Sequence, residues 1–368
     1  MKFEIARRDL LRPIQLVTGV VEKRQTLPIL SNVRIGVKGD ELTVSGTDLE
    51  IELVARVKLA TPAAEDGETT VPARKLADLW RSLPEDAVVT VSAEGERATI
   101  RSGRTKFLLA TKSADEYPSL DSTDDAPEIF VPRTEVAGLI ARTGFSMAQQ
   151  DVRYFLNGLL LELGDGLLRA VATDGHRLAT ATTGVAASPS TKLQAIVPRK
   201  AVQEIARLLT EGDDEVSIRI GSSSLQLATS SFRLSTKLID GRFPDYEKVI
   251  PPRGSREIIG GRDALRQAFG RAAILSNEKY RGVRLTIGEG SLTVHANNPE
   301  QEEAEEVVEL ETSGEPIEIS FNVSYLQDAL GAMQGDMVRL SLTDANSSAR
   351  LEAPGDDSAT YVVMPMRL

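Results

Sequence analysis

The feature that most constrains this chain is a repeat of roughly 125 residues that occurs three times. The segments VPARKLADLW, VPRKAVQEIA and FNVSYLQDAL begin at positions 71, 197 and 321, so they are 126 and 124 residues apart. A second set begins at Phe3, Phe130 and Ile258, with spacings of 127 and 128, and a third aligns Asp48, Asp174 and Asn298. Independent segments at one spacing predict three similar domains in a row.

Each repeat is predicted to contain a helix, strands, a second helix and further strands. Leu10, Ile14, Val17 and Val21 recur at helical spacing, whereas ELTVSG and SLTVHA alternate as strands do. Short Gly, Asp and Ser turns favour antiparallel sheets, so the expected fold class is α+β. Helices are predicted over 6–21, 72–82, 132–148, 198–209, 261–276 and 321–333, with the proline of Val-Pro in the first turn of two of them. The expected domains are 1–125, 126–253 and 254–368, joined through 121–128 and 250–255.

Composition excludes several classes of function. The chain has no cysteine, which excludes disulfides, thiolate zinc sites, iron–sulfur clusters and a cysteine nucleophile. No apolar run approaches the ~18–20 residues of a membrane helix, and the N-terminal residues MKFEIARRDLL lack the apolar core of a secretory signal. These features predict a cytoplasmic protein.

The charges are unevenly distributed. The net charge is −11, yet the predicted helices carry 14 Lys and Arg against 6 Asp and Glu. Solvated helix faces often carry such cations, and that interpretation stays open for any one helix. Five of the six predicted helices carry more Lys and Arg than Asp and Glu. This excess favours a shared basic surface that contacts DNA phosphates independently of base sequence. The low aromatic content of 4% does not support base stacking.

One run has the opposite sign. Five glutamates fall within seven residues of NNPEQEEAEE, at positions 300, 302, 303, 305 and 306. Clustered carboxylates can bind a divalent cation, but the spacing fits no loop motif. A solvated acidic edge is favoured, and it would complement the basic segment RSGRTKF at 101–107.

The segment VATDGHRLATA raises the question of catalysis. Asp174 and His176 could orient a base beside Thr173 as nucleophile. The chain has neither a G-x-S-x-G elbow nor a G-x-x-x-x-G-K-[ST] loop, so a structural histidine is favoured over a hydrolase. A repeat scaffold without DNA is a third hypothesis, and it leaves the basic helices unexplained.

A resemblance to a known family extends over the whole length. Its motifs are TLPILSN (26–32), GTDLE (46–50), TVPARK (70–75), QDVRYFLNG (150–158), VATDGHRLA (171–179), IVPRK (196–200), DGRFPDY (240–246), AILSNEKYRGVRL (273–285), NNPEQEEAEE (297–306), FNVSY (321–325) and YVVMPMRL (361–368). On these motifs the chain resembles the beta subunits of bacterial DNA polymerase III, the sliding clamps.

The resemblance implies the clamp fold and a non-catalytic processivity factor without a cofactor. Members are head-to-tail homodimers whose six domains form a ring, with basic helices facing duplex DNA. The implied partners are double-stranded DNA, a second copy of the chain, the polymerase III alpha subunit, the clamp loader, and other polymerases and repair proteins that bind through short peptides. The acidic run then has a role in the dimer, and a metal site is disfavoured.

The resemblance also assigns three sets of residues. The peptide-binding cleft between the second and third domains would comprise Leu156, Thr173, Gly175, His176, Arg177, Leu178, Pro244, Lys248, Val249, Asn346, Val362, Met364, Pro365, Met366 and Arg367. Lys248 and Asn346 depart from the family pattern of an arginine and an apolar residue, which bears on peptide preference. The DNA contacts would be Arg24, Arg74, Gln150, Arg153, Arg199 and Lys200. In the dimer, Phe107 would pack on Ile274 and Leu275, and Lys75, Arg97, Arg104 and Lys106 would face Glu300, Glu302, Glu303 and Glu306.

Overall fold

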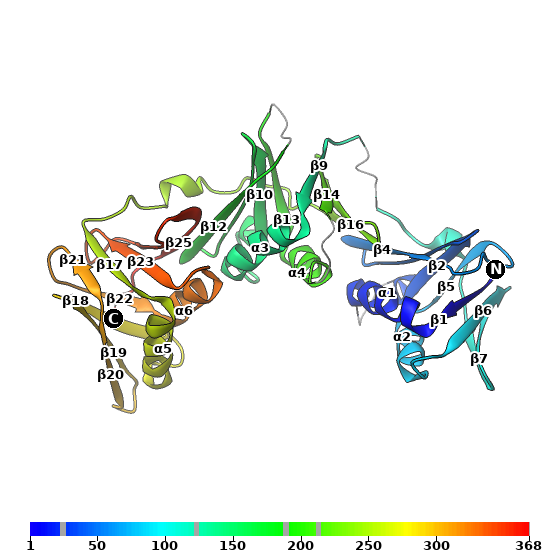
Figure 1. Cartoon of the computed structure of the whole chain (residues 1–368), viewed down its shortest axis with the longest axis horizontal. Coiled ribbons are helices and arrows are strands. Elements are labelled where there is room, and N and C mark those ends of the chain that lie inside the picture. The colour runs from blue at the N-terminus through cyan, green and yellow to red at the C-terminus, as the bar shows by residue number, and fades with distance from the viewer. Residues whose placement is uncertain (23–26, 121–124, 187–190, 211–214, 368) are drawn as a thin grey trace. The chain divides into compact units, whose positions relative to one another are not determined.

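The computed structural model describes residues 1–22, 27–120, 125–186, 191–210 and 215–367. Two compact units contain these residues: Met1–Thr134 with Gln203–Leu238, and Glu135–Val202 with Ile239–Leu368. Each unit holds two antiparallel sheets (Figure 1). The division falls inside the second repeat because each of its two sheets continues into a sheet of a neighbouring repeat.

The same series of elements occurs three times. The first repeat comprises β1 (Lys2–Ala6), α1 (Arg7–Val20), η1 (Pro28–Ser31), β2 (Asn32–Lys38), β3 (Glu41–Thr47), β4 (Ile51–Lys58), β5 (Gly67–Pro72), α2 (Ala73–Ser82), β6 (Val88–Glu94), β7 (Arg97–Ser102), β8 (Thr105–Ala110) and η2 (Ala114–Glu116). The second comprises β9 (Glu128–Pro132), α3 (Arg133–Thr143), η3 (Gly144–Ser146), η4 (Tyr154–Leu156), β10 (Gly158–Gly164), β11 (Leu167–Thr173), β12 (Arg177–Gly184), β13 (Leu193–Pro198), α4 (Arg199–Leu208), β14 (Glu215–Ile220), β15 (Ser224–Ala228), β16 (Phe232–Lys237) and η5 (Tyr246–Lys248). The third comprises β17 (Arg256–Gly261), α5 (Arg262–Ala272), η6 (Ala273–Leu275), β18 (Gly282–Gly288), β19 (Ser291–Asn297), β20 (Glu303–Glu309), β21 (Glu311–Ser313), β22 (Ile317–Asn322), α6 (Val323–Ala332), β23 (Met337–Leu342), β24 (Ala349–Ala353) and β25 (Asp356–Val363).

Strand order confirms the predicted α+β repeats. The order β5-β2-β3-β4 recurs as β13-β10-β11-β12 and as β22-β18-β19-β20, and the order β1-β6-β7-β8 recurs as β9-β14-β15-β16 and β17-β23-β24-β25. The repeats join through strands at corresponding positions, since β4 pairs with β16 and β12 pairs with β25. Each junction therefore turns two sheets of four main strands into one continuous sheet.

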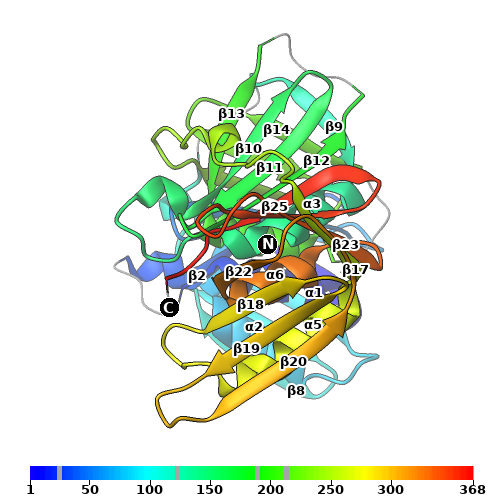
Figure 2. The same ribbon diagram turned by 90° about the vertical axis from the view of Figure 1, so that its left-hand side faces the viewer.

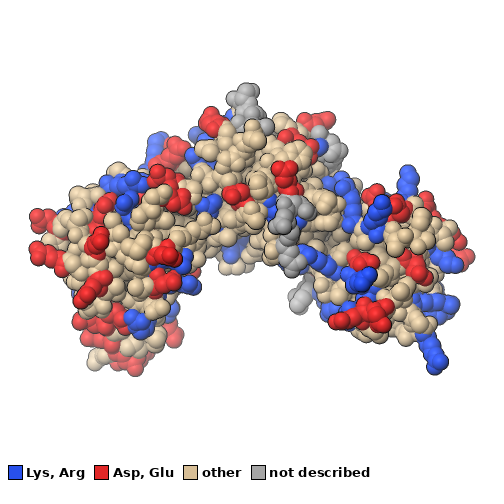
Figure 3. Space-filling view, in the orientation of Figure 1, with Lys and Arg blue, Asp and Glu red and all other residues tan. Residues whose placement is uncertain are grey.

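The sheets have one polar face. The strand β18 alternates buried and exposed residues, and on β20 Glu303, Glu305, Val307 and Glu309 are exposed, as expected for antiparallel sheets with one solvated side. Figure 2 looks onto the outer face of the sheet β22-β18-β19-β20. In Figure 3, acidic side chains gather over the part of the third repeat where β19 and β20 lie in Figure 1.

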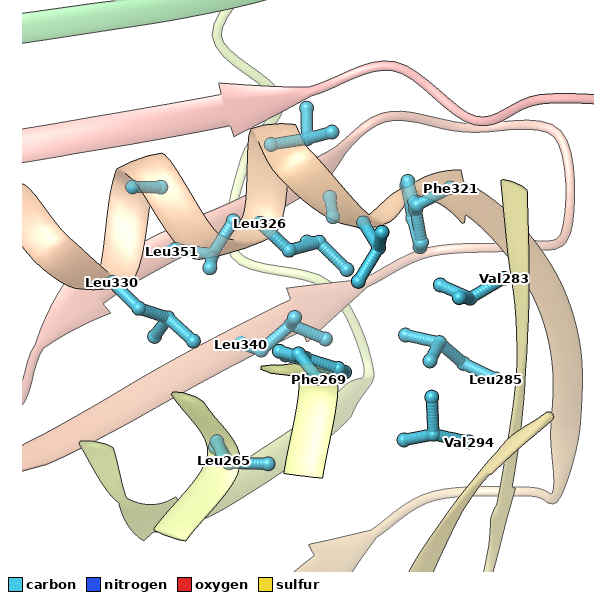
Figure 4. Packing of buried hydrophobic residues seen from close by; sticks show 14 of the residues in the cluster. Leu265, Phe269, Val283, Leu285, Val294, Phe321, Leu326, Leu330, Leu340 and Leu351 are labelled. Atoms are coloured by element: carbon cyan, nitrogen blue, oxygen red, sulfur yellow. The ribbon is translucent and has the colours of Figure 1, made fainter. Parts of the chain in front are cut away.

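The opposite face is covered by helices. In the third repeat, Leu265 and Phe269 of α5 meet Leu326 and Leu330 of α6 in one buried cluster with side chains of β18 and β19 (Figure 4). Burial of each such side chain contributes about 1.5–3 kcal/mol to folding. The helices are thus held by one apolar stripe, which leaves their other faces available for charged residues.

Three local predictions were wrong. The helices α3 and α5 end at Thr143 and Ala272 rather than at 148 and 276, and each continues as a short 3₁₀ turn, η3 and η6. Pro72 and Pro198 are the last residues of strands β5 and β13 rather than first-turn residues. The predicted alignment of the first strand of the second repeat, which matched Phe130 with Phe3, was off by one residue. The exposure shows this, since Ile129 is buried and Phe130 is 55% exposed. A one-residue shift reverses every side chain of a strand, so Ile129, not Phe130, corresponds to the buried Phe3.

Candidate functional site

Residues 174–176 form the turn between β11, which ends at Thr173, and β12, which begins at Arg177. The carboxylate of Asp174 accepts hydrogen bonds from the backbone N–H of His176 (2.9 Å) and of Arg177 (3.0 Å). The hydroxyl of Thr173 donates to the carbonyl of Arg177 (2.7 Å) and accepts from the N–H of Gly175 (3.1 Å). Gly175 has a φ of +87°, a conformation that side chains disfavour. The Asp-Gly-His-Arg run is therefore built to close a turn.

The first repeat builds the same turn. There Asp48 accepts from the N–H of Glu50 (2.9 Å) and of Ile51 (2.8 Å), and the Thr47 hydroxyl donates to the Ile51 carbonyl (2.8 Å). Because the Thr173 hydroxyl proton points at a carbonyl rather than at an imidazole, the turn does not form a nucleophile–base pair. The exposed His176 ring instead stacks on Tyr325, with ring centroids 6.4 Å apart and an interplanar angle of 19°.

Arg177 is held on all sides. Its guanidinium bonds Asp174 (Nε to Oδ2, 3.1 Å), Asp328 of α6 (Nη1 to Oδ2, 2.5 Å) and the carbonyl of Phe145 (2.8 Å). It also lies over the rings of Tyr325 (4.6 Å) and Phe145 (5.2 Å). The Arg177 side chain is only 13% exposed, and three of its five N–H donors are used within the chain.

An apolar cluster lies beside this turn. Leu156, Leu178 and Val362 are buried together with Phe243 and Tyr246. The sequence placed the first three in the cleft, and the structure brings them into one cluster although they lie more than 200 residues apart at the extremes. The ring of Tyr246 is held in this cluster through its hydroxyl, which donates a hydrogen bond to the buried Glu162 and accepts one from Arg169 (2.7 Å).

Glu162 is buried among compensating partners. Lys192 (2.9 Å) and Gln194 (2.6 Å) bind its Oε1. Burial acts to raise the pKa of Glu162, but hydrogen bonds from Tyr246, Lys192 and Gln194 outweigh it and lower the pKa. The pKa of Tyr246 is raised by burial and by Glu162. A satisfied polar network thus fixes the ring of Tyr246 in the apolar cluster.

The end of the chain lines the same region. The N–H of Met364 donates to the carbonyl of His176 (2.9 Å), and the N–H of Met366 donates to the carbonyl of Ser320 (2.7 Å). Met364 and Val249 are partly exposed large apolar side chains, at 37% and 38%. The remaining cleft residues are exposed or half-buried: Pro244, Lys248, Asn346, Pro365 and Arg367. Lys248 pairs with Asp245 at 2.7 Å, which raises the pKa of Lys248.

The predicted DNA contacts differ in how freely they reach solvent. Arg74 is exposed on α2, and Gln150 is exposed with a φ of +56°. Arg153 forms two hydrogen bonds to Asp151 (3.0 and 2.8 Å), which hold the pKa of Asp151 at about 2. Arg199 donates to the carbonyl of Met147 (3.1 Å), and Lys200 is half-buried. Arg24 lies outside the described residues.

The expected basic surface is smaller than the helix charge suggested. Arg133 and Arg142 of α3 are buried, so for that helix the prediction was wrong. Arg207 is committed to Glu204 (2.5 Å) and to the Leu16 carbonyl (2.6 Å). Exposed cations remain on three of the described helices: Arg8 and Arg12 on α1, Arg74, Lys75 and Arg81 on α2, and Arg266 and Arg271 on α5, of which Arg271 is bonded to Glu306. The sequence gives the number of charged residues on each helix. Only the packed structure shows which of the guanidinium groups are buried or bonded within the fold and which remain exposed.

The predicted dimer residues lie on two edge strands and their surroundings. Within the described sheets, β8 and β20 are each at the end of a strand order. The basic set comprises Lys75 of α2, Arg97 of β7, Arg104 in the turn before β8, and Lys106 and Phe107 of β8. The other set comprises Ile274 and Leu275 of η6, Glu300 and Glu302 before β20, and Glu303 and Glu306 on it. Ile274 is 75% exposed, and Glu306 already binds Arg271 of its own chain through two 2.7 Å hydrogen bonds.

Comparison with known proteins covers the whole chain. Profiles of the DNA polymerase III beta subunit match with their N-terminal domain at residues 1–121, their central domain at 130–245 and their C-terminal domain at 247–367. The beta sliding clamp of Pseudomonas putida is 51% identical over 368 residues, with 100% of both chains covered. The beta sliding clamp of Escherichia coli K12 is 50% identical over 369 residues, with 100% of both chains covered.

This chain belongs to the beta sliding clamp family. The crystal structure of the Pseudomonas aeruginosa DNA polymerase III beta subunit superposes with a TM-score of 0.97 at 51% identity and 100% coverage of both chains. The sliding clamp of Bacillus subtilis gives a TM-score of 0.95 at 27% identity, covering 100% of this chain and 99% of the other. The clamp fold and the function of a DNA sliding clamp, a processivity factor and not an enzyme, are thereby confirmed.

Several residues of the clamp's candidate cleft escaped the sequence analysis. They are Phe145, Phe243, Tyr246, Tyr325 and Asp328. One signal was present, since Tyr325 and Asp328 are three residues apart on one face of α6 and Asp328 is the only charge on that helix. Among the described residues, no group of three or more acidic or histidine side chains could hold a metal ion. No helix in the described ranges is long and apolar enough to cross a membrane.

Proposed function

We propose that this sliding clamp works as a ring of two copies joined head to tail, and one observation carries the proposal. Both internal junctions pair the fourth strand of one sheet with the fourth strand of the next, β4 with β16 and β12 with β25. The corresponding strands still lacking such a partner in the described sheets are β20 and β8. A third junction of the same kind joins β20 of one copy to β8 of the other, and a heterologous contact that closes produces a ring.

The internal junctions also supply a register for the contact. Leu53 faces Leu234 at the first junction, and Ala179 faces Tyr361 at the second. The strand pairings inside each repeat show which residues occupy the same position in the three repeats. By these pairings Ala304 occupies the position of Leu53 and Ala179. Phe107 occupies the position of Leu234 and Tyr361. Ala304 of one copy is therefore expected opposite Phe107 of the other, and Glu305 opposite Lys106. Opposite charges facing each other across two strands favour this alignment.

Cysteine cross-linking tests the register, since the natural chain contains no cysteine. Thr105 and Glu306 are the counterparts of the facing pair Phe232 and Ala55. A variant with Thr105→Cys and Glu306→Cys should therefore oxidise to a covalent dimer, because directly opposed residues bring Cβ atoms within disulfide reach. The control, Thr105→Cys with Ala304→Cys, displaces one thiol by two residues on the same face and should remain monomeric on a denaturing gel. Equal cross-linking of both variants, or of neither, would refute the register.

We infer that the ring encircles duplex DNA and that its contacts are made to phosphates. The exposed cations of α1, α2 and α5, together with the predicted residues Arg24, Arg74, Gln150, Arg153, Arg199 and Lys200, would supply weak, salt-sensitive attraction. After loading, the clamp should stay on circular DNA and slide off the same DNA once it is linearised. Equal retention on both forms would count against encirclement.

We propose that the cleft between the second and third repeats binds short peptides of the polymerase III alpha subunit, the clamp loader and other replication and repair proteins. Leu156, Leu178 and Val362 supply an apolar floor for leucine or phenylalanine anchors, and Met364 adapts to different partners. The junction of the first and second repeats does not offer an equal surface, because the facing pair Glu52 and Ser235 takes the place of Leu178 and Val362 there. Tyr117 fills that region further by bonding the N–H of Thr47 (3.2 Å) and the Asn32 carbonyl (3.1 Å).

Truncation after Val363 tests the cleft. The shortened chain should lose affinity for a peptide with leucine and phenylalanine anchors and should keep the mass of the dimer in solution. Loss of the dimer with retained peptide binding would show that the C-terminal residues serve the ring instead.

Under this proposal the three repeats act as domains 1–125, 126–253 and 254–368, and the clamp works on DNA in the cytoplasm.

A further inference from the structure

A hollow lies on the outer face of the third repeat, next to the residues of the proposed cleft. Its volume is about 740 Å³, and its lining includes Gly282 and Arg284 of β18, His295 of β19, Ser320 of β22, and Met366 with Arg367. Gly282 lies opposite Asn322 on the neighbouring strand. Figure 2 looks onto this face of the sheet.

The hollow is continuous with the end of the proposed cleft. Met366 pairs with Ser320 at the edge of the sheet, Ser320 faces Arg284, and Arg284 faces His295. These four residues form one row that crosses from the C-terminal segment onto the sheet. Met366 and Arg367 were assigned to the cleft and also line the hollow, so a peptide that leaves the cleft past Met366 enters it.

The chemistry of the lining favours a negatively charged occupant. Donors come from Arg284, Arg367, His295 and the side-chain amides of Asn277 and Asn297, whereas Glu318 is the single acidic residue of the lining. The side-chain amide of Asn298 already donates to Glu302 (2.6 Å). Arg284 lies 3.7 Å from Glu318, and both side chains are partly exposed, at 46% and 59%. So loose a pair leaves the guanidinium able to form shorter hydrogen bonds to a carboxylate. Negative charge borders the hollow on the β20 side, since Glu303 lies 4.0 Å from His295 and Glu305 is paired with His295 across the two strands.

We propose that this hollow binds an acidic residue in the segment that flanks the anchor residues of a partner peptide, with Arg284 and Arg367 as its main contacts. The inference deepens the proposed peptide-binding function and rests on it. It makes the C-terminal residues a divider between two subsites, an apolar one for the anchors and a polar one for an Asp or Glu beside them. Partners that carry such an acid would then bind more tightly than partners with the anchors alone.

Synthetic peptides and the full-length clamp test the proposal. The probes are an anchor peptide, the same peptide extended with aspartates at either end, and the same peptide extended with lysines. One aspartate extension should tighten binding by about 3- to 10-fold, as a charge-assisted hydrogen bond at a partly exposed site does. The lysine extensions should not. Arg284→Gln should remove the gain and leave the affinity of the unextended peptide unchanged.

The chain supplies a matched control. Arg34 of β2 is the counterpart of Arg284 in the first repeat, where it binds Glu68 (2.9 Å), so Arg34→Gln should change neither affinity. A gain that persists in Arg284→Gln, or no gain from either aspartate extension, would refute the second subsite while the cleft stands. Failure of the unextended peptide to bind would refute the cleft itself, and the subsite with it. Thermal unfolding of both variants shows that the exposed substitutions leave the fold intact.

Discussion

Arg177 and Asp328 form an ion pair with 2.5 Å between Nη1 and Oδ2, across 151 residues of sequence. The pair joins the β11–β12 turn of the second repeat to α6 of the third. It also explains why the one helix without cations carries a lone acid, since Asp328 neutralises an arginine instead of facing solvent alone. Arg177 is therefore fixed in place beside the residues of the proposed cleft, and His176 and Tyr325 lie stacked beside it.

Replacement of Asp328 by asparagine should weaken peptide binding without removing any residue of the apolar floor. We expect a loss of about 3- to 10-fold in affinity and a decrease of about 0.5–1 kcal/mol in the free energy of unfolding, because Asp328 is 47% exposed. The chain has two histidines, so proton NMR can follow His176 against His295. The His176 ring resonances should move, and those of His295 should not.

Asp78→Asn is the control for that variant. Asp78 occupies the corresponding position of α2 and pairs with Arg81 at 3.1 Å on the surface. The control should leave peptide affinity and both histidine resonances unchanged. If Asp328→Asn behaves like Asp78→Asn, the ion pair does not position the cleft.

Loss of the hydroxyl should affect stability to different extents at two buried tyrosines. Tyr246→Phe removes partners of Glu162 and Arg169 and should lower the free energy of unfolding by about 1–2 kcal/mol. Tyr361 is also buried, but its hydroxyl has no hydrogen-bond partner among the described residues, so Tyr361→Phe should change stability by less than about 0.5 kcal/mol. Urea unfolding measures both, and equal losses would contradict this account.

Alkaline pH should unfold the clamp through its buried phenols. Burial raises the pKa of Tyr117 and of Tyr361 to about 12, and burial together with Glu162 raises the pKa of Tyr246. A raised folded-state pKa means that the folded chain holds protons that the unfolded chain releases near pH 10. The stabilisation is therefore complete below pH 10 and is lost as the pH rises through about 12. Phenolate absorbance of these three residues should appear together with unfolding, and a gradual rise without unfolding would contradict the prediction.

Gly175→Ala should strain the turn beside the cleft. A Cβ at this position would lie 3.0 Å from the guanidinium nitrogens of Arg153 in a backbone with φ of +87°. We expect a loss of about 1 kcal/mol in stability and a displaced Arg153. Gly166→Ala is the comparison, because its φ of +74° is similar but nothing lies within 4 Å of its Cβ. The Arg153 side-chain resonances should shift in the first variant and stay in place in the second.

The sequence by itself predicted three repeats, their α+β composition, the approximate position of each of the six α-helices and the family, because these follow from the spacing of similar segments, from periodicity and from motifs. It also assigned Leu156, Leu178 and Val362 to one site. Only the tertiary structure decided that Arg133 and Arg142 are buried, that Glu306 binds Arg271 and that Arg177 binds Asp328. The partner of a charge is chosen by which side chains the packed fold brings within a few ångströms, and separation along the chain carries no record of that choice.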